Sequence, residues 1–148
     1  MASTIYVEDS QIDIEYCNIT LNTAIVKGTI YALTNPQVTI RNSVITKNLA
    51  MGDSAVLFAN NIPLHNITFV NTSITENTAS SNSFSFLFAS GVFQNCTLYK
   101  NKATSENNGA TLFNSKVYLL DTNVTCSNDT DVTAITNTVD TGFFQLDY

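Results

Sequence analysis

The sequence has few charged residues. Only 12% of its 148 residues are Asp, Glu, Lys or Arg, about half the share of an average soluble domain. The net charge is −6, and the six Lys and Arg are scattered along the chain. Nucleic-acid-binding proteins instead present a basic patch or stripe, so we expect no nucleic acid as a partner.

Long apolar runs are also missing. No segment approaches the roughly 20 residues that a membrane-spanning helix needs, and we expect no membrane insertion. The N-terminus, MASTIYVEDS, has neither the basic nor the apolar region of a signal peptide. If the protein is secreted, we expect its signal to have been removed, or the chain to be part of a longer product, which leaves open whether Met1 is the native start.

Residues that build catalytic and metal sites are few and dispersed. Arg41 is the only arginine, His65 is the only histidine, and no CxxC or Cys/His spacing suggests a metal. A polysaccharide-acting enzyme would need clustered carboxylates with a basic residue beside them, whereas the carboxylates here are spread along the chain. We therefore predict no catalytic residue, no metal, no cofactor and no enzymatic activity.

What the sequence has in abundance is asparagine and threonine, with 19 and 21 copies. They belong to a nine-residue pattern that occurs five times, with starts 26, 29, 24 and 26 residues apart. The copies are IEYCNITLN (14–22), IRNSVITKN (40–48), FVNTSITEN (69–77), FQNCTLYKN (93–101) and LLDTNVTCS (119–127). A second motif, such as GTIYA (28–32) and AVLFA (55–59), lies between the copies. One repeat thus covers the chain, and we predict a single domain over residues 1–148.

The composition of the repeat selects one kind of solenoid. Leucine-rich repeats need a leucine framework that is absent, and helical repeats have longer periods. Short alternating segments rich in Val, Ile, Thr and Phe favour strands. Three short strands in every 24–29 residues predict an all-β, right-handed parallel β-helix of about five to six coils, in which stacking buries what one coil cannot.

Aligned columns of the repeat support this prediction. Two wholly apolar columns are expected to point inward, Ile14, Ile40, Phe69, Phe93, Leu119 and Ile19, Ile45, Ile74, Leu98, Val124. The column Cys17, Ser43, Thr72, Cys96, Thr122 is small, as an inward bend requires. Asn22, Asn48, Asn77 and Asn101 should form an asparagine ladder, because Asn tolerates left-handed turns and can bond neighbouring backbone. The aromatic column Tyr6, Tyr31, Phe58, Phe88, Phe113 is placed inside, with an exposed seam as the alternative.

This pattern of apolar–x–apolar, a polar bend and xITxN resembles right-handed parallel β-helix repeats, the pectin-lyase-like superfamily in the broad sense. It is similar in particular to repeats of polymorphic outer-membrane proteins and of large microbial surface glycoproteins. The resemblance covers roughly residues 4–146. It implies the fold far more than the function, because the superfamily includes lyases, adhesins, tailspikes and structural proteins.

Six sequons for N-glycosylation are present. They start at Asn18, Asn66, Asn71, Asn95, Asn123 and Asn128. In the repeat alignment Asn71 and Asn95 share one outward column, and Asn18 and Asn123 share another. We therefore predict N-linked glycans along one exposed edge and an extracellular or cell-surface location.

Three cysteines, an odd number, exclude a fully disulfide-paired monomer. Cys17 and Cys96 share a column but lie three coils apart, about 14 Å at the usual strand spacing, which exceeds disulfide reach. We expect both to be small buried core residues. Cys126 falls near a turn and is either free or linked to another chain.

Both ends of the chain stop part-way through a repeat and carry no cap, so we expect the ends to pair with each other. The leading hypothesis is a non-enzymatic structural glycoprotein that stacks head to tail, as a homopolymer, into a filament or surface coat. Its interface would contain Tyr6 and Ile12 at one end and Phe143, Phe144 and Leu146 at the other. The alternative is an internal segment of a large cell-surface adhesin. Ice binding through the Thr20, Thr46, Thr75, Tyr99, Thr125 column is less favoured, because Tyr99 interrupts the threonines.

Overall fold

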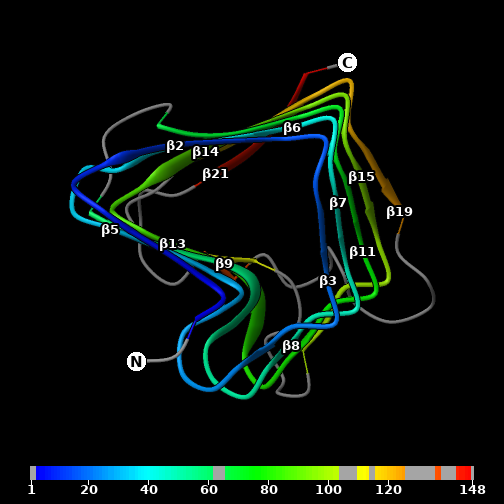
Figure 1. Cartoon of the computed structure of the whole chain (residues 1–148). Coiled ribbons are helices and arrows are strands. Elements are labelled where there is room, and N and C mark those ends of the chain that lie inside the picture. Colours follow the sequence, from blue (N-terminus) through cyan, green and yellow to red (C-terminus); the bar gives the residue numbers. More distant parts are fainter. Residues whose placement is uncertain are drawn as a thin grey trace.

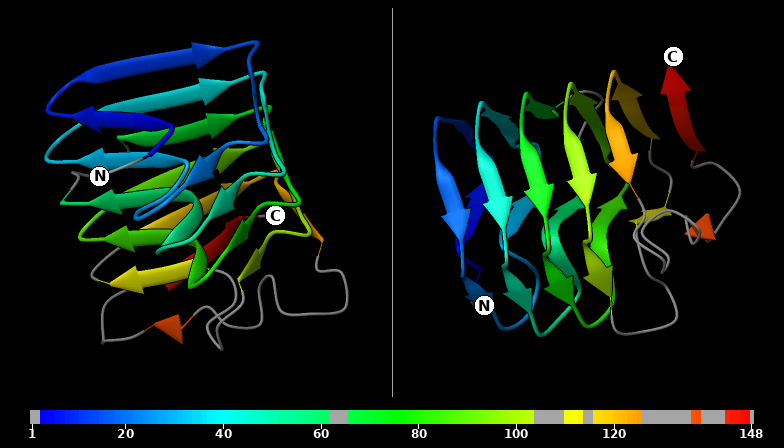
Figure 2. Two further views of the ribbon diagram at one scale, coloured as in Figure 1. Left: turned by 60° about the horizontal axis from the view of Figure 1, so that its bottom comes forward. Right: turned by 90° about the vertical axis from the view of Figure 1, so that its right-hand side faces the viewer.

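The computed structural model describes residues 3–61, 66–103, 110–113, 116–125, 136–137 and 143–147. Every regular element among them is a β-strand, and the strands form four parallel sheets. The sheets are the sides of a β-solenoid of about four turns, seen down its axis in Figure 1 and from the side in Figure 2. The predicted parallel β-helix is confirmed, whereas the right-handedness and the count of five to six coils stay predictions.

Each of the first four coils contributes one strand to each sheet, so a coil has four strands and not the predicted three. We name the sheets A to D. Sheet A contains β1 (Ile5–Glu8), β5 (Ile30–Leu33), β9 (Ser54–Asn60), β13 (Asn82–Leu87), β17 (Ala110–Phe113) and β20 (Thr136–Asn137). Sheet B contains β2 (Gln11–Glu15), β6 (Gln37–Arg41), β10 (Ile67–Val70), β14 (Ser90–Gln94), β18 (Lys116–Leu120) and β21 (Phe143–Asp147). Sheet C contains β3 (Asn18–Thr20), β7 (Val44–Thr46), β11 (Ser73–Thr75), β15 (Thr97–Tyr99) and β19 (Asn123–Thr125). Sheet D contains β4 (Thr23–Ala24), β8 (Leu49–Ala50), β12 (Thr78–Ala79) and β16 (Lys102–Ala103).

The apolar columns run through the solenoid as the repeat predicts. In sheet B the register aligns Ile14, Ile40, Phe69, Phe93 and Leu119. In sheet C it aligns Ile19, Ile45, Ile74, Leu98 and Val124. Ile40, Phe69, Ile45 and Ile74 are fully buried. The rings of Phe69 and Phe93 stack with centroids 4.7 Å apart, so neighbouring coils share one continuous core.

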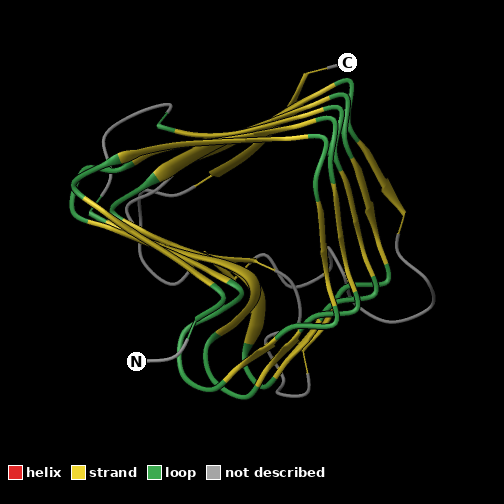
Figure 3. Ribbon diagram, in the orientation of Figure 1, coloured by secondary structure: helices red, strands yellow, loops and turns green. Residues whose placement is uncertain are grey.

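Sharp corners separate the sheets and appear as loops between strands in Figure 3. At the described corners from sheet A to B, from B to C and from C to D, a residue other than glycine adopts a positive φ. Between sheets B and C these residues are Tyr16, Asn42, Asn71, Asn95 and Asp121, with φ from 46° to 53°. Between sheets C and D they are Leu21, Lys47, Glu76 and Lys100. The left-handed conformation disfavours most side chains, so each coil needs compensating bonds at its corners.

The buried asparagines supply these bonds at the corner between sheets C and D. We call Asn22, Asn48, Asn77 and Asn101 the inner amide ladder. Oδ1 of Asn77 accepts from both the backbone N–H and Nδ2 of Asn48, at 3.0 and 2.9 Å. Nδ2 of Asn77 donates to Oδ1 of Asn101 at 2.8 Å and to the carbonyl of Ile45 at 3.0 Å. The predicted ladder is confirmed, but the left-handed residue is the one before each asparagine.

The predicted aromatic column is wrong in two respects. Tyr6, Tyr31 and Phe58 do align, but Phe58 pairs with Ser85, and Phe88 lies at a corner, where it is 52% exposed. The register of β9 with β13 shifts by one residue between Asn82 and Phe84, where β9 has one residue more. In the next pairing, of β13 with β17, Phe113 lies opposite Leu87.

The aromatic ladder also lies on the outer face of sheet A. The alternating positions, Ile30, Leu57 and Phe84, point inward, where Phe84 meets Phe93 edge to face at 5.4 Å. Phe58 nevertheless stays 5% exposed. The ammonium group of Lys27 covers its ring at 4.4 Å and forms an ion pair with Asp53 at 2.6 Å.

Candidate functional surfaces

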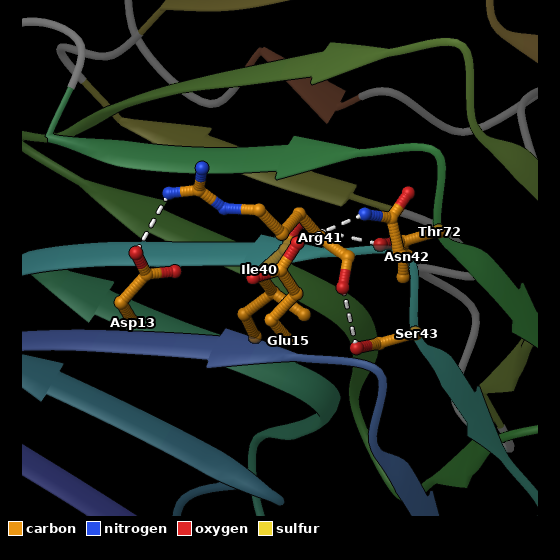
Figure 4. Close-up of polar contacts among 7 residues, drawn as sticks. All are labelled: Asp13, Glu15, Ile40, Arg41, Asn42, Ser43 and Thr72. Carbon is orange, nitrogen blue, oxygen red and sulfur yellow. Dashed lines mark hydrogen bonds and ion pairs between the residues drawn. The ribbon is translucent and has the colours of Figure 1, made fainter.

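The corner between sheets B and C carries an exposed row of amides, which we call the outer amide ladder. Nδ2 of Asn71 donates to Oδ1 of Asn42 at 3.1 Å, and Nδ2 of Asn95 donates to Oδ1 of Asn71 at 2.7 Å. Nδ2 of Asn42 donates in turn to Oε1 of Glu15 at 3.1 Å, so a carboxylate of the first coil accepts the last bond of the row (Figure 4). This row was predicted as a column but not as a bonded chain.

Hydroxyl groups hold the same corner from inside. Oγ of Ser43 donates to the carbonyl of Arg41 at 2.7 Å, and Oγ1 of Thr72 lies 3.3 Å from the carbonyl of Ile40 (Figure 4). Both side chains are buried, as the small column predicted. The hydroxyls replace backbone partners that the bend removes, and the outward amides are thereby held at fixed positions.

The register places the sequon asparagines of both predicted pairs in shared columns. Asn71 and Asn95 share the outer amide ladder and are exposed. Asn18 is exposed and shares a register column with Asn123, through Val44, Ser73 and Thr97. Asn66 is half-buried and its Nδ2 lies 3.5 Å from Oδ1 of Asn35. Asn128 lies outside the described residues, as do Cys126 and His65.

The first coil forms an end surface that we call the N-terminal face, made by β1, β2, β3 and β4. Each of these strands is the outermost in its sheet and pairs with one neighbour only among the described strands. Ile12 and Ile14 are half-buried, whereas their column neighbours Val38 and Ile40 are fully buried. The core columns therefore open onto this face, where unpaired backbone groups and apolar side chains meet.

Several further apolar side chains surround the N-terminal face. They are Tyr6, Tyr16, Leu21, Ile25 and Val26, which are between 41% and 78% exposed. Five of the nine exposed large hydrophobic side chains among the described residues thus belong to the first 26 residues. Single exposed apolar residues are ordinary, so what distinguishes the first coil is that it carries more of them than any other described coil.

Tyr6 makes a contact that the sequence analysis missed. Its hydroxyl donates to Oε2 of Glu8 at 2.5 Å, and this hydrogen bond, together with burial and the charge of Glu8, raises the pKa of Tyr6 to about 12. The signal for this pair is their spacing of two residues in β1, because such residues point to the same side of a strand.

At the other end, β20 and β21 are the outermost strands of sheets A and B. The register places Phe144 in the column of Val117, and Leu146 in the column of Leu119. Both predicted interface residues therefore occupy columns that are buried in the preceding coil. Phe143 pairs with Lys116. Sheet C ends one coil earlier, at β19, among the described strands.

The two described cysteines differ in burial. Cys96 is 2% exposed, and this burial raises the pKa of its thiol. Cys17 is exposed, so its predicted burial is wrong. It occupies the inward column, where Ser43 Oγ accepts from its backbone N–H at 3.1 Å, but it belongs to the first coil and has a neighbouring coil on one side only.

A shallow hollow of about 250 Å³ lies where sheets C and D meet, lined by Glu76, Thr78, Lys100 and Lys102. Nζ of Lys47 lies 4.0 Å from Oε2 of Glu76. Nζ of Lys100 lies 4.9 Å from the centroid of the Tyr99 ring. Hydrogen bonding to the side chain of Tyr99 raises the pKa of Lys100. Across the described ranges no group of three or more His, Cys, Asp or Glu could hold a metal ion. In the same ranges no helix is long and apolar enough to cross a membrane.

Comparison with family models, with curated proteins and with solved structures gives no significant match. The assignment to the pectin-lyase-like superfamily therefore stays a prediction based on the repeat pattern.

Proposed function

We propose that this protein is a structural subunit whose solenoid stacks end to end into a filament or surface coat. The observation that carries this proposal is the N-terminal face, where four parallel sheets each begin with a strand that has one free edge among the described residues. Free strand edges are templates for pairing with another chain. Because the two ends of a solenoid differ, such pairing is head to tail and does not close into a ring.

The repeat itself supplies the geometry of the junction. If β2 of one subunit pairs with β21 of the next, Ile12 continues the column of Phe144, and Ile14 continues the column of Leu146. Each backbone bond across the junction adds about 0.5–1.5 kcal/mol, and each apolar side chain that becomes buried adds about 1.5–3 kcal/mol. Ordering of the interface offsets part of this gain.

The dimensions of the fibre follow from the strand count. Sheet B has six strands per subunit, so the axial repeat is about 29 Å at 4.8 Å per strand. Sheet A also has six described strands, so its axial repeat is the same.

The proposal includes an extracellular location and N-linked glycans. The sequon at Asn18 has an exposed asparagine in β3, on the side of the N-terminal face. The sequons at Asn71 and Asn95 have exposed asparagines on the corner beside sheet C, in coils away from the two ends of the solenoid. Glycans there would leave the junction free and cover the side of a fibre. The right-handed sense of the coil and the pectin-lyase-like relationship belong to the same proposal, and the repeat pattern of the sequence supports them.

A second candidate is an internal segment of a large cell-surface adhesin. The observation that favours it is that sheets C and D have fewer described strands than sheets A and B, and a longer polypeptide would continue all four sheets with its own next strands. In that case the columns at both ends would continue within one chain. The mass of the native polypeptide separates the two candidates.

Sedimentation and electron microscopy of the purified 148-residue chain test the proposal. We expect fibres one solenoid thick with a repeat of about 29 Å. Deletion of residues 142–148 should leave a folded protein that does not polymerise. Val44→Asp, which changes an outward position on the side of the solenoid, should polymerise as the wild type does. A full-length chain that stays monomeric at high concentration would refute end-to-end assembly.

A further inference from the structure

The junction of the proposed filament would bring two carboxylates into one column. The register of sheet B aligns Glu15 with Arg41, Arg41 with Val70, Val70 with Gln94, Gln94 with Leu120, and Leu120 with Asp147. The column faces outward, since Glu15 and Gln94 are exposed. When β2 of a second copy pairs with β21, its Glu15 therefore takes the position next to Asp147, one strand spacing or about 4.8 Å away.

A shift of register cannot relieve this opposition. Moving β2 by one residue along β21 would turn its side chains to the other face and would remove Ile12 and Ile14 from the apolar columns. Moving it by two residues would break the match of Ile14 with Leu146. The pairing that buries the apolar columns is thus the pairing that sets Glu15 against Asp147.

The groups around Glu15 do not cancel its charge. On β6 the opposite residue is Arg41, but its guanidinium lies 2.7 Å from Oδ2 of Asp13 (Figure 4). The other neighbour from that coil is the neutral amide of Asn42, at 3.1 Å. The first coil thus brings two carboxylates and one guanidinium to the junction.

The C-terminal end of the other copy brings no compensating cation to Glu15. Gln145 would lie beside Asp13, and Asp121 follows the end of β18. Residues 121–148 contain five Asp and no Lys or Arg, and residues 1–26 contain four acidic residues and no Lys or Arg. Acidic ends therefore meet at the junction, although their apolar columns match.

We propose that protonation controls the assembly of this protein, because the Glu15–Asp147 opposition weakens the junction at neutral pH and is relieved in acid. This inference rests on the proposed end-to-end assembly and adds its regulation. Like charges directly opposite one another destabilise strand pairs. Carboxyl side chains take up protons as the pH falls towards about 4, and a neutral partner removes the repulsion. The stacked state binds protons more readily than free subunits, so its stability decreases as the pH rises.

The test measures the critical concentration for fibre formation by the full-length chain at low salt. At pH 7.5 we expect Asp147→Asn to lower it about fivefold, the effect of removing one such repulsion. Asp147→Lys should lower the critical concentration further, because the new ammonium group would lie opposite the carboxylate of Glu15. The double variant Glu15→Lys with Asp147→Lys should raise the critical concentration again, because two ammonium groups would then face one another. Glu76→Gln is the control, since it removes one charge at a corner far from both ends.

Acidification of the wild type is the second arm. The sequence pI is about 4.4, where disordered precipitation competes with assembly, so only fibres with the repeat of about 29 Å are counted. We expect such fibres to form at lower concentration at pH 5 than at pH 7.5, and salt at 0.5 M to reduce the difference by screening.

The outcomes separate the two proposals. Fibres that form equally well at both pH values, and in all the charge variants, would refute the control by protonation and retain the assembly. Absence of fibres from every variant, at either pH, would refute the assembly itself. If Asp147→Lys lowers the critical concentration and the added Glu15→Lys does not reverse this change, Glu15 is not the residue opposite position 147.

Discussion

Nδ2 of Asn77 lies 2.8 Å from Oδ1 of Asn101 in the next coil, and both side chains are buried. The same Nδ2 donates its second hydrogen to the carbonyl of Ile45 in the coil before. One amide group therefore links three successive coils. A carboxylate or an aliphatic side chain of similar size could not donate either bond.

The inner amide ladder should be sensitive to loss of its donors. Asn77→Asp would leave the Ile45 carbonyl without its donor and place an acidic oxygen against Oδ1 of Asn101. We expect the free energy of unfolding to fall by about 3 kcal/mol or more, since buried polar groups lose their partners. The matched control is Asn71→Asp in the exposed outer amide ladder, which should cost under about 1 kcal/mol. Urea denaturation of both variants measures the difference, and equal losses would contradict the role of burial.

The apolar register predicts opposite outcomes at two adjacent positions. Ile45 is fully buried, whereas Val44 is 36% exposed and points outward. Ile45→Asp would place a charge inside the stack and should prevent folding. Val44→Asp should retain the β-sheet circular dichroism spectrum and a cooperative thermal transition. A native melting curve for Ile45→Asp would show the register to be wrong.

The turn that leads from β8 in sheet D to β9 in sheet A, between the second and third coils, requires a glycine at position 52. A Cβ atom added to Gly52 would lie 1.6 Å from the carbonyl oxygen of Val26 in the coil before. The backbone would have to move, so we expect Gly52→Ala to lower the free energy of unfolding by about 1–3 kcal/mol. Met51→Ala, at a neighbouring position that is 59% exposed, should change it by less than about 0.5 kcal/mol.

The sequons predict sugar on the side of the solenoid. We expect at least two of Asn18, Asn71, Asn95 and Asn123 to carry N-glycans in protein from the native source. A glycan on Nδ2 of Asn71 leaves one N–H, which can still donate to Asn42. Glycopeptide mass spectrometry after enzymatic release in heavy-oxygen water identifies each site. If all four asparagines are unmodified, the part of the proposed function that makes this protein a glycoprotein is wrong.

The hydrogen bond from Tyr6 to Glu8 predicts a late tyrosine titration. The pKa of Tyr6 is raised to about 12, so its contribution to stability is present below pH 10 or so, the value for a free tyrosine. It is lost as the pH rises towards 12. NMR of the ring should show Tyr6 protonated at pH 11 while the spectrum remains that of the folded protein. Glu8→Gln should bring its ionisation back towards pH 10, and an unchanged titration would contradict the bond.

The repeat in the sequence was enough to predict the solenoid and most of its columns. A single coil cannot bury its apolar face alone, so each coil must place an apolar side chain at the same position. The column Ile14, Ile40, Phe69, Phe93 and Leu119 shows this requirement in the sequence. The inner amide ladder was predictable for the same reason, because each asparagine bonds its own counterpart one coil away. The sequon columns follow from the alternation of side chains in strands.

The aromatic ladder was decided by the tertiary structure. Matching aromatic to aromatic placed Phe88 on Phe58, whereas the register of β9 with β13, which includes a bulge, puts Ser85 there, and Phe88 lies at a corner. A local insertion changes register without changing composition. The outer position of Tyr31 and Phe58 depends on the cover that Lys27 provides from a turn, which no strand pattern contains.

The sequence by itself determined which residues repeat and which of them face inward, because both follow from the period of the coil and the alternation of strands. Only the tertiary structure decided which groups meet across coils. It exposes Cys17 although its column is inward, because burial depends on having a coil on both sides. It joins Glu15 to Asn42, and Arg41 to Asp13, because these bonds depend on how side chains are oriented at a corner. The acidic opposition at the proposed junction likewise follows from the strand register in space, since Glu15 and Asp147 lie at opposite ends of the sequence.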